Sequence, residues 1–506
     1  METEIELKFF VSQDYSTILH TKISESKVLQ HSRRQLGNTY FDTEDNWLRQ
    51  HDIGLRIRRY DDVFVQTVKT AGRVIAGLHQ RPEYNAEHTS NEPDLSLHPE
   101  DIWPSDRSID QLQNELTPLF STDFIREQWL ISMSDGSQIE VAFDSGVVVA
   151  GEKEEPICEV ELELKSGQTD ALFTLARILS DGGGIRLGNL SKAARGYRLA
   201  NGYSADPVLP LSLVKTTSAD SVETCFINSL EHALSHWHYH EQIYVENESI
   251  DALREMSSAI AFINQTLSIY EEIIPRRAST ILRQELRWIE QEFAWINSYD
   301  HIDDLLKDKG HILRKLDARK FLMAELKALQ ETYPERESVL KFIHSSRYMA
   351  LLLDLSRWIL ARGWQPFIDD KSREKLNESV YAFACEQLNK SWFELKEAFP
   401  IEKVLSAEDY IAQQECLARN LYTGIGFAKL YERDERRTFR LPWADLLQGI
   451  DDLLTLEPLE NLVEKLELGE REQVERWLLR QENSILHAME QTRAITSSNT
   501  PYWTEQ

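Results

Sequence analysis

The feature that most constrains this chain is the alternation of charged and apolar residues through its first 200 positions. Successive side chains of a β-strand point to opposite faces, so residues two apart share one face. The stretch EIELK places Glu4, Glu6 and Lys8 on one face and two apolar residues on the other. One such stretch is also typical of an amphipathic strand with a wet outer surface.

The same period-two pattern recurs often enough to predict a complete barrel. It indicates eight strands, at 4–11, 35–42, 55–60, 63–70, 77–85, 124–133, 137–149 and 157–165. Short helices are expected near 14–24 and 170–179. Most connections are too short for crossovers, so the strands should be antiparallel, and eight strands can close into a barrel.

Like charges stand two apart on single predicted strands. Arg56 and Arg58 share one face, as do the acidic residues of 159–163. Like charges at this spacing destabilise a sheet by tenths of a kcal/mol per pair, so groups of opposite sign should lie between them. Ionised faces would then line the barrel interior, and the apolar outer faces would need cover from helices or from a second domain.

The charged faces predict a site for a polyphosphate and a divalent metal ion. Carboxylates of the first and last strands offer the all-oxygen ligation that suits Mg²⁺ or Mn²⁺ better than Zn²⁺. Arginines and lysines of the middle strands can clamp phosphate oxygens, because the planar guanidinium gives bidentate contact.

Beyond residue 220 apolar residues recur at intervals of three and four, which predicts an all-helical bundle. Residues 201–220 are rich in Asn, Gly, Ser, Thr and Pro and lack periodicity. We therefore expect an α+β protein with a barrel domain at 1–201, a linker at 202–219, a helical domain at 220–496 and a loose tail at 497–506.

Composition excludes several classes of protein. A formal charge of −28 disfavours nucleic acid and anionic membranes as partners. The acidic start does not fit a signal peptide, and no apolar run is long enough to span a bilayer. Four scattered cysteines argue against a disulfide framework or a thiolate zinc site, so the reducing cytoplasm is the simplest location.

The charged residues fall in the order found in the CYTH superfamily, the triphosphate tunnel metalloenzymes. The first 200 residues resemble that family through Glu4–Lys8, Arg56-Ile-Arg58, Lys69, Arg126, Glu159–Glu163 and Ser191-Lys192. The helical half resembles the CHAD domain, and the arrangement of the two resembles bacterial inorganic triphosphatases.

This resemblance implies metal-dependent hydrolysis of inorganic triphosphate to pyrophosphate and phosphate inside a β-barrel tunnel, with one or two Mg²⁺ or Mn²⁺ ions. The implied metal ligands are Glu4, Glu6, Asp144 and Glu161, joined by Glu159 or Glu163. The implied triphosphate-binding residues are Lys8, Arg56, Arg58, Lys69, Arg81, Arg126 and Lys192. Glu4, Glu6 and Lys8 would act in catalysis, and Glu83 is a candidate for taking up the proton.

Three other functions stay open. A thiamine triphosphatase would differ only in substrate, and a class IV adenylate cyclase, a lyase, would need a base pocket beside the tunnel. A non-catalytic polyphosphate receptor would keep the arginines without needing Glu4, Glu6 and Glu161 together. The retention of all three carboxylates favours the hydrolase.

The helical half departs from the CHAD pattern, which is associated with polyphosphate binding. Its first long helix keeps one arginine, Arg254, where the family has a ladder of His and Arg. We expect its basic clusters, such as 276–277, 283–287 and 433–440, to be solvated helix faces, and the stripe His232, His236 and His240 to serve packing. A structural role is therefore expected, with polyphosphate docking as the alternative.

Overall fold

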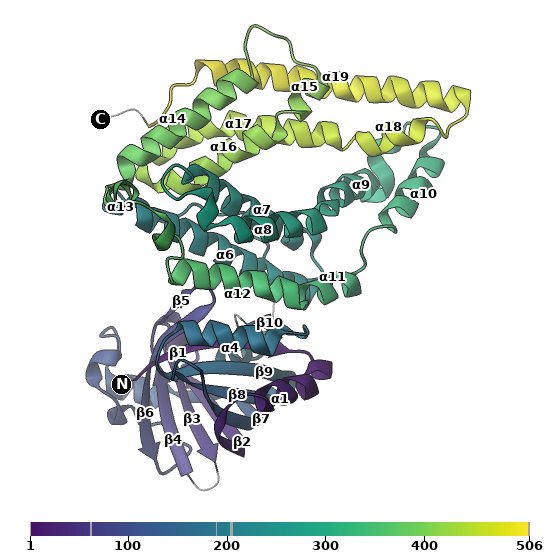
Figure 1. The fold of residues 1–506 in the computed structure, drawn as a ribbon. Helices are drawn as coiled ribbons and strands as arrows, with labels where there is room; N and C mark the ends of the chain where they lie inside the picture. Colours follow the sequence, from purple (N-terminus) through teal and green to yellow (C-terminus); the bar gives the residue numbers. More distant parts are fainter. Residues whose placement is uncertain (1, 61–62, 189, 203–205, 504–506) are drawn as a thin grey trace. The chain divides into compact units, whose positions relative to one another are not determined.

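The computed structural model describes residues 2–60, 63–188, 190–202 and 206–503 (Figure 1). Two compact units make up the chain. The first contains Met1–Asp206 together with Leu340–Gly363, and the second contains Pro207–Val339 and Trp364–Gln506.

The first unit is built on a closed antiparallel barrel of eight strands, as the sequence predicts (Figure 1). The neighbours around the barrel run β1, β9, β8, β7, β2, β3, β4, β6 and back to β1. These strands are β1 (Glu2–Val11), β2 (Val28–Asp42), β3 (Gly54–Tyr60), β4 (Val63–Lys69), β6 (Leu78–His88), β7 (Thr117–Ser132), β8 (Gln138–Ala150) and β9 (Lys153–Ser166).

Two features of the sheet go beyond the prediction. β2 and β7 begin earlier than expected, because they pair with each other along their whole length, from Val28 opposite Ile131 to Asp42 opposite Thr117. Two short strands, β5 (Arg73–Ile75) and β10 (Ile185–Leu187), add to β6 and β1 outside the closed ring. Their three residues are too few for a period-two signal.

The register explains how like charges two apart are tolerated. Directly opposed residues of an antiparallel pair share a face. The opposed pairs of unlike charge are Glu4 with Arg81, Lys8 with Glu161, Lys69 with Glu83, and Arg126 with Asp144. These pairs bring opposite charges together as expected, whereas Glu6 with Glu163 and Asp144 with Glu159 are opposed pairs of like charge. The ionised faces point into the barrel.

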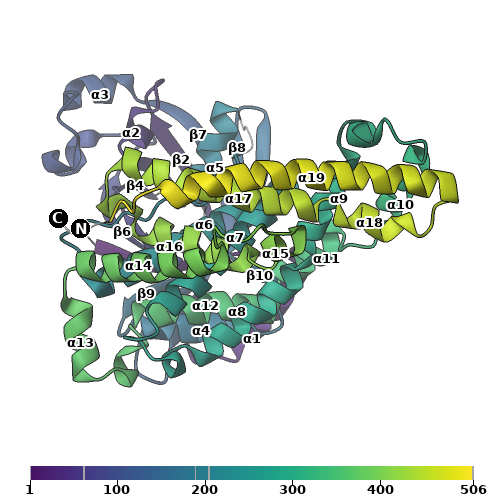
Figure 2. The same cartoon turned by 90° about the horizontal axis from the view of Figure 1, so that it is seen from above.

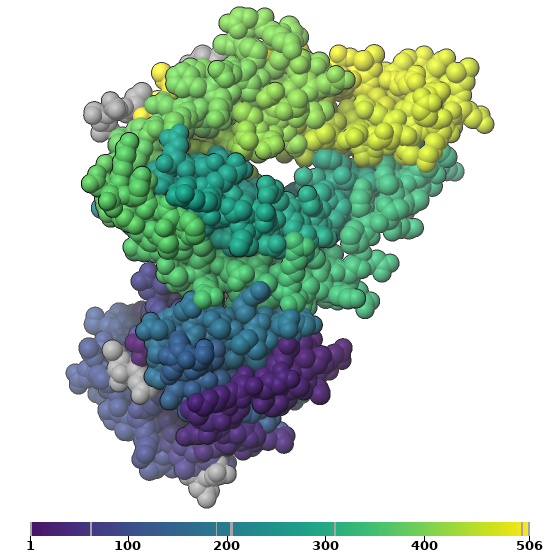
Figure 3. Space-filling view, viewed as in Figure 1, coloured from purple at the N-terminus to yellow at the C-terminus, as the bar shows by residue number. Residues whose placement is uncertain are grey.

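Helices of the first unit cover the apolar outer faces. α4 (Asp170–Ser180) buries Leu172, Leu175 and Leu179 and contacts β1 and β9, while α1 (Ser16–Ser24), preceded by η1 (Gln13–Tyr15), packs beside α4. In Figure 3 the purple and blue residues of these two helices lie on the near side of this unit. α12 (Ser346–Leu360) also packs along α4, where Arg357 pairs with Asp170 at 2.5 Å.

A second apolar layer covers the other side of the barrel. Trp47 and Trp103 pack with Leu55, Ile57 and Val68 of β3 and β4. The segments that supply this layer are α2 (Trp47–Gln50), η2 (Leu95–Leu97), η3 (Glu100–Ile102) and α3 (Ile109–Glu115).

One end of the barrel is filled by α5 (Lys192–Asn201). Its Tyr197 packs among inward-facing residues where β2 ends and β7 begins, including Tyr40 and Phe120. Ser191 caps the helix, since its hydroxyl accepts the amide of Ala194. The sequence analysis did not foresee this helix.

Asp42 joins α5 to the barrel from a fully buried position. Its carboxylate accepts the backbone amides of Thr43, Leu48 and Arg49 and the hydroxyl of Tyr197, the last at 2.7 Å. The side chain is 1% exposed, so water cannot replace any of these contacts.

We predict that Asp42→Ala lowers the free energy of unfolding of the first unit by about 3 kcal/mol, because it strands several buried donors at once. Calorimetry of the full chain measures the shift. Asp181→Ala removes a mostly exposed carboxylate from the same unit and should change stability by less than about 0.5 kcal/mol. Equal effects of the two variants would contradict the structural role of Asp42.

The second unit is helical, as predicted. It contains α6 (Val222–Asn247), α7 (Ile250–Ile269), η4 (Arg276–Ala278), α8 (Thr280–Phe293), α9 (Trp295–Gly310), η5 (His311–Leu313), α10 (Arg319–Gln330), η6 (Gln365–Phe367), α13 (Asp370–Asn377), α14 (Val380–Ala398), α15 (Ala407–Ile411), α16 (Gln414–Phe427), η7 (Ala428–Leu430), α17 (Arg433–Leu454), α18 (Glu457–Val463) and α19 (Leu468–Ser498). α11 (Arg336–Ile343) spans a boundary between the units. α17 and α19 lie side by side (Figure 2). Among the described residues, no helix is both long and apolar enough to cross a membrane.

The predicted linker and tail are packed where they are described. Thr216 is buried in the second unit and donates its hydroxyl to the carbonyl of Gly426. Trp503 is 3% exposed and donates its indole N–H to Asn389 at 2.8 Å. The expectation of a loose tail is therefore wrong for 499–503, because aromatic burial anchors it, whereas 203–205 and 504–506 lie outside the described residues.

The histidine stripe on α6 serves packing, as expected. His232 contacts the carbonyl of Ser212 at 2.8 Å, and the amide of Leu209 donates to His240. His236 pairs with Glu255 at 2.9 Å. Two of the three histidines thus fasten the segment before α6 onto the helix.

Several basic residues of the second unit bind helix carbonyls, against the expectation of solvated faces. Arg283 donates to the carbonyl of Leu267 at 2.8 Å and Arg440 to that of Leu421 at 2.9 Å. Arg436 is 9% exposed and donates to the carbonyl of Ala428. Leu267 lies in the last turn of α7, where carbonyls lack intrahelical partners, so Arg283 satisfies one of them.

Candidate active site

A cavity of about 900 Å³ occupies the barrel interior and is lined by side chains from all eight barrel strands and from α5. Most residues predicted for the site meet there. Those that line it are Glu4, Glu6, Lys8, Arg56, Arg58, Lys69, Arg81, Glu83, Arg126, Glu161, Glu163 and Lys192. Asp144 and Glu159 lie beneath the lining, each 0% exposed.

Three carboxylates, those of Asp144, Glu159 and Glu161, form what we call the inner carboxylate cluster, with one oxygen from each within 4.8 Å of the others. Arg126 holds Asp144 with two hydrogen bonds, of 2.7 and 2.6 Å. Lys192 contacts all three carboxylates, with Nζ 2.6 Å from Asp144 and 3.2 Å from Glu161. The Lys192 ammonium, which belongs to the first turn of α5, therefore lies among the three carboxylates.

The neighbouring cations outweigh burial and lower the pKa of two carboxyls of the cluster, Asp144 and Glu161. Burial alone would raise the pKa of the Glu161 carboxyl, but Lys192, Lys8 and Arg126 hold it well below its usual range. Burial would lower the pKa of Lys8, but Glu161 and Glu159 raise it well above normal. Each charge in the cluster is therefore kept by its neighbours.

A second group, which we call the Lys69 cluster, consists of Glu4, Lys69 and Glu83. The Lys69 ammonium binds both carboxylates, with Glu83 at 2.8 Å. Although burial opposes ionisation, Lys69 and Arg56 lower the pKa of Glu83 to about 2. A carboxylate of such low pKa is a weak general base at neutral pH.

Negative charge is in excess where β1 meets β9. Glu6 stands directly opposite Glu163 in this pair of strands. Burial raises the pKa of Glu6 to about 7, and the nearby carboxylates of Glu161 and Glu4 add to the effect against Lys8. Burial also raises the pKa of Glu163, although Lys165 pairs with it at 2.8 Å. A hard divalent cation would relieve the repulsion between these carboxylates. Among the described residues, the carboxylates whose oxygens already lie close enough together to hold an ion are those of the inner carboxylate cluster.

Positive charge is in excess on the middle strands. Burial, together with the adjacent Arg56 and Arg126, lowers the pKa of Arg58 to about 9. Arg58 donates its Nε–H to Asn38 at 3.0 Å, which orients the guanidinium. The three arginines repel one another across a buried space, and an anion of several charges would stabilise them.

Arg81 is the predicted substrate ligand least available to a substrate. Its guanidinium donates to the backbone carbonyls of Thr70 and Asp52, the latter at 2.7 Å. Arg81 lines the cavity, but these bonds fix it against the loop that follows β4 and the residues before β3.

Sequence reasoning missed several residues of the site. Asn38 and Tyr40 of β2 face inward beside the arginines, and Arg195 of α5 reaches Glu159. Strand parity could have found the first two, because they alternate with outward residues. The contact of Arg195 depends on how α5 docks, for which the local sequence carries no signal.

We predict that Arg126→Met lowers the free energy of unfolding of the first unit by about 3 kcal/mol, because it leaves the buried Asp144 carboxylate without its bidentate partner. The double variant Arg126→Met/Asp144→Leu should recover most of this loss, since no buried charge is then uncompensated. Thermal melting of the full chain compares them. A double variant less stable than Arg126→Met would contradict the prediction.

Family models match both halves of the chain. Residues 2–197 match the CYTH domain, and residues 228–457 match the CHAD domain. The inorganic triphosphatase of Haemophilus influenzae is 41% identical over 202 residues, which are 40% of this chain and 56% of that protein. This chain therefore spans little more than half the length of that relative.

Two solved structures have related parts. A Hippeastrum protein, described as an adenylyl cyclase with a dominant triphosphatase activity, is 20% identical, with a TM-score of 0.30, and the match covers 40% of this chain and 97% of that one. The CHAD domain from the plant Ricinus communis is 16% identical, with a TM-score of 0.44, over 59% of this chain and 99% of that one.

Proposed function

We propose that this chain, in which a CYTH domain is followed by a CHAD domain, hydrolyses inorganic triphosphate to pyrophosphate and phosphate with Mg²⁺ or Mn²⁺. The observation that carries the proposal is the separation of charge inside one cavity, where half-buried arginines on the middle strands and carboxylates at the pairing of β1 with β9 line the same space. A linear polyanion carrying a divalent cation complements both regions.

The cations of the cavity would bind the triphosphate. Arg56, Arg58 and Arg126 offer planar donors to non-bridging oxygens, and Lys8, Lys69 and Lys192 offer point charges. The lysines and Arg126 are paired with carboxylates, so the phosphate would take over part of each pairing. These residues would also hold the chain of phosphates extended, which favours in-line attack at its end.

Glu4, Glu6 and Glu163, with Glu161 at the edge of the inner carboxylate cluster, would hold one or two divalent ions. When bound, the metal neutralises charge on the phosphate oxygens and on the departing pyrophosphate. Asp144 and Glu159 are shut out of the cavity and bound to cations, so we assign them to the support of Lys192 and Arg126.

In the reaction, the water oxygen would bond to the terminal phosphorus, the bond from that phosphorus to the bridging oxygen would break, and the proton of the water would pass to the phosphate products or to solvent. Arg56, Arg58 and Lys8 would stabilise the charge that builds on the transferred and leaving groups. The weak basicity of Glu83 makes it an anchor for Lys69 rather than a proton acceptor.

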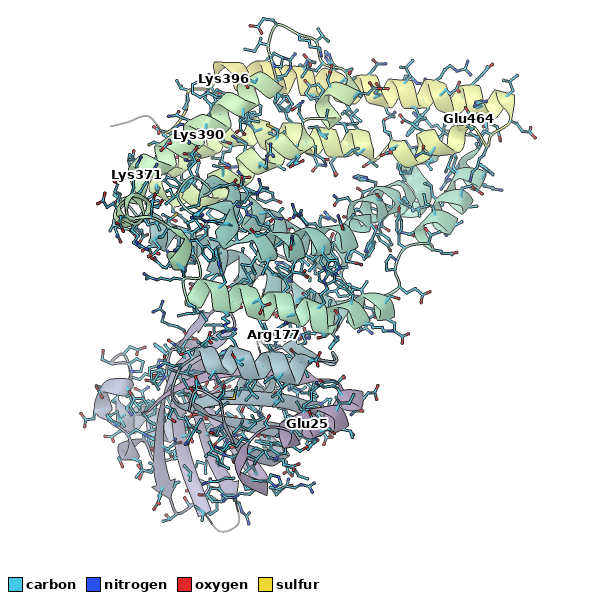
Figure 4. All side chains as sticks on the ribbon, in the orientation of Figure 1. Glu25, Arg177, Lys371, Lys390, Lys396 and Glu464 are labelled. Carbon is cyan, nitrogen blue, oxygen red and sulfur yellow. The ribbon has the colours of Figure 1, made fainter. Side chains whose placement is uncertain are left out.

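A substrate panel tests the proposal against its rivals. We expect phosphate release from inorganic triphosphate with Mg²⁺ or Mn²⁺, its loss with chelator, and a fall of at least about 100-fold in Glu6→Ala. Glu25→Ala, at the exposed end of α1 (Figure 4), is the control and should keep full activity.

Other outcomes of the same panel favour the rivals. Preferred release from thiamine triphosphate would indicate a thiamine triphosphatase, and cyclic AMP formed from ATP would indicate a cyclase. Tight polyphosphate binding without turnover, unchanged in Glu6→Ala, would overturn the enzyme proposal in favour of a receptor.

We predict that Arg56→Lys raises KM for triphosphate about 10- to 100-fold, because the ammonium cannot reproduce the bidentate contact. Arg59→Lys is a matched control on the same strand, since Arg59 is exposed and lies against Phe64 rather than in the cavity. Steady-state kinetics compare the two. Equal KM values for Arg56→Lys and the unsubstituted protein would exclude Arg56 as a triphosphate ligand.

For the helical half we propose a structural role. Three of its arginines, Arg283, Arg436 and Arg440, donate to backbone carbonyls, which leaves them less able to bind polyphosphate. The limits 1–201 and 220–496 remain our proposal for the two domains. A reducing setting such as the cytoplasm agrees with four cysteines present as free thiols.

A further inference from the structure

The Glu159 side chain is closed off from the cavity. It is 0% exposed and does not line the cavity, yet three cations surround it. Lys192 contacts it directly, Arg195 lies 3.3 Å away through Nη1, and Lys8 lies 3.7 Å away. Two of these cations, Lys192 and Lys8, also line the cavity, whereas Arg195 does not.

Arg195 is fixed more firmly than a general counter-ion would require. Its Nε–H donates to Glu155 at 2.5 Å and its Nη2 to the carbonyl of Pro156, both at the start of β9. Its guanidinium lies 5.8 Å from the centre of the Phe10 ring, and the side chain is 6% exposed. Only the Nη1 donor is directed at Glu159.

Lys192 and Lys8 are shared between Glu159 below the lining and Glu161 at the lining. Their Nζ atoms lie 3.2 and 2.7 Å from Glu161. Arg195 partly neutralises the Glu159 carboxylate, so Glu159 attracts Lys192 and Lys8 less strongly. In a space of low dielectric this competition is strong, because Coulomb interactions are poorly screened there.

We propose that Arg195 and Glu159 form a positioning pair that sets how firmly Lys192 and Lys8 are available to the triphosphate. The inference rests on the proposed function. It adds Arg195, which does not line the cavity, as a residue that influences triphosphate binding. Arg195 lies three residues after Lys192 on α5, so one helix supplies both the cation that reaches the cavity and the cation that frees it.

The first test is Arg195→Met with inorganic triphosphate. Without the guanidinium, Glu159 draws on Lys192 and Lys8 alone, and we expect KM to rise about tenfold while kcat stays within about threefold. Arg198→Met is the matched control, since Arg198 lies one turn away on α5, pairs with Asp206 and does not line the cavity. It should leave both constants unchanged.

The double variant Glu159→Gln/Arg195→Met separates positioning from simple support of the fold. Removing both charges frees the lysines again, so KM should return to within about threefold of the unsubstituted protein. A role limited to anchoring α5 predicts instead that the double variant is no better than Arg195→Met. Thermal melting checks folding, and Arg195→Gln, which removes the charge but keeps hydrogen-bond donors, replaces Arg195→Met with the same expected rise in KM if Arg195→Met fails to fold.

A binding measurement gives a readout apart from turnover. Titration calorimetry with inorganic triphosphate in the presence of chelator should show the same tenfold weakening in Arg195→Met and its recovery in the double variant. Normal turnover with an unchanged KM and affinity in Arg195→Met overturns the positioning pair but leaves the proposed function standing. An unsubstituted protein that binds triphosphate without hydrolysing it overturns the enzyme proposal, and the calorimetry still decides on the pair.

Discussion

The ammonium of Lys192 among the carboxylates of Asp144, Glu159 and Glu161 is the interaction on which the rest of the first unit depends. A closed barrel with ionised inner faces would repel itself unless charges of opposite sign were brought together across it. α5 supplies one such charge, and its docking at the barrel end carries Arg195 and Tyr197 with it. The packing of α5 against the barrel therefore also balances the charges inside it.

The balance inside the barrel is incomplete, and its two imbalances define the site. Carboxylates outnumber cations near Glu6 and Glu163, and guanidinium groups crowd together near Arg56 and Arg58. Fully compensated interiors serve stability, whereas buried groups with perturbed pKa values mark places prepared for a ligand of opposite charge. The two imbalances therefore support the proposal of a substrate that combines a metal ion with a triphosphate.

Strand parity was enough to predict the eight-stranded barrel and most of its inner face, because the side chains of a strand alternate strictly. Glu4, Glu6 and Lys8 were found in this way. Strand parity tells which face a residue is on but not how deeply it is buried. It therefore placed Asp144 and Glu159 together with the carboxylates that line the cavity. The docking of α5, the network of Asp42 and the packing of Trp503 depend on contacts between distant segments, and local sequence does not encode them.

The central claim is that one phosphoanhydride bond of inorganic triphosphate is cleaved by water inside the barrel. Phosphorus NMR of the full chain with inorganic triphosphate and Mg²⁺ tests it most directly, because it follows substrate and products together. The account predicts that phosphate and pyrophosphate appear in equal amounts and that Glu6→Ala forms neither. An unchanged triphosphate signal, or phosphate formed without pyrophosphate, would contradict it.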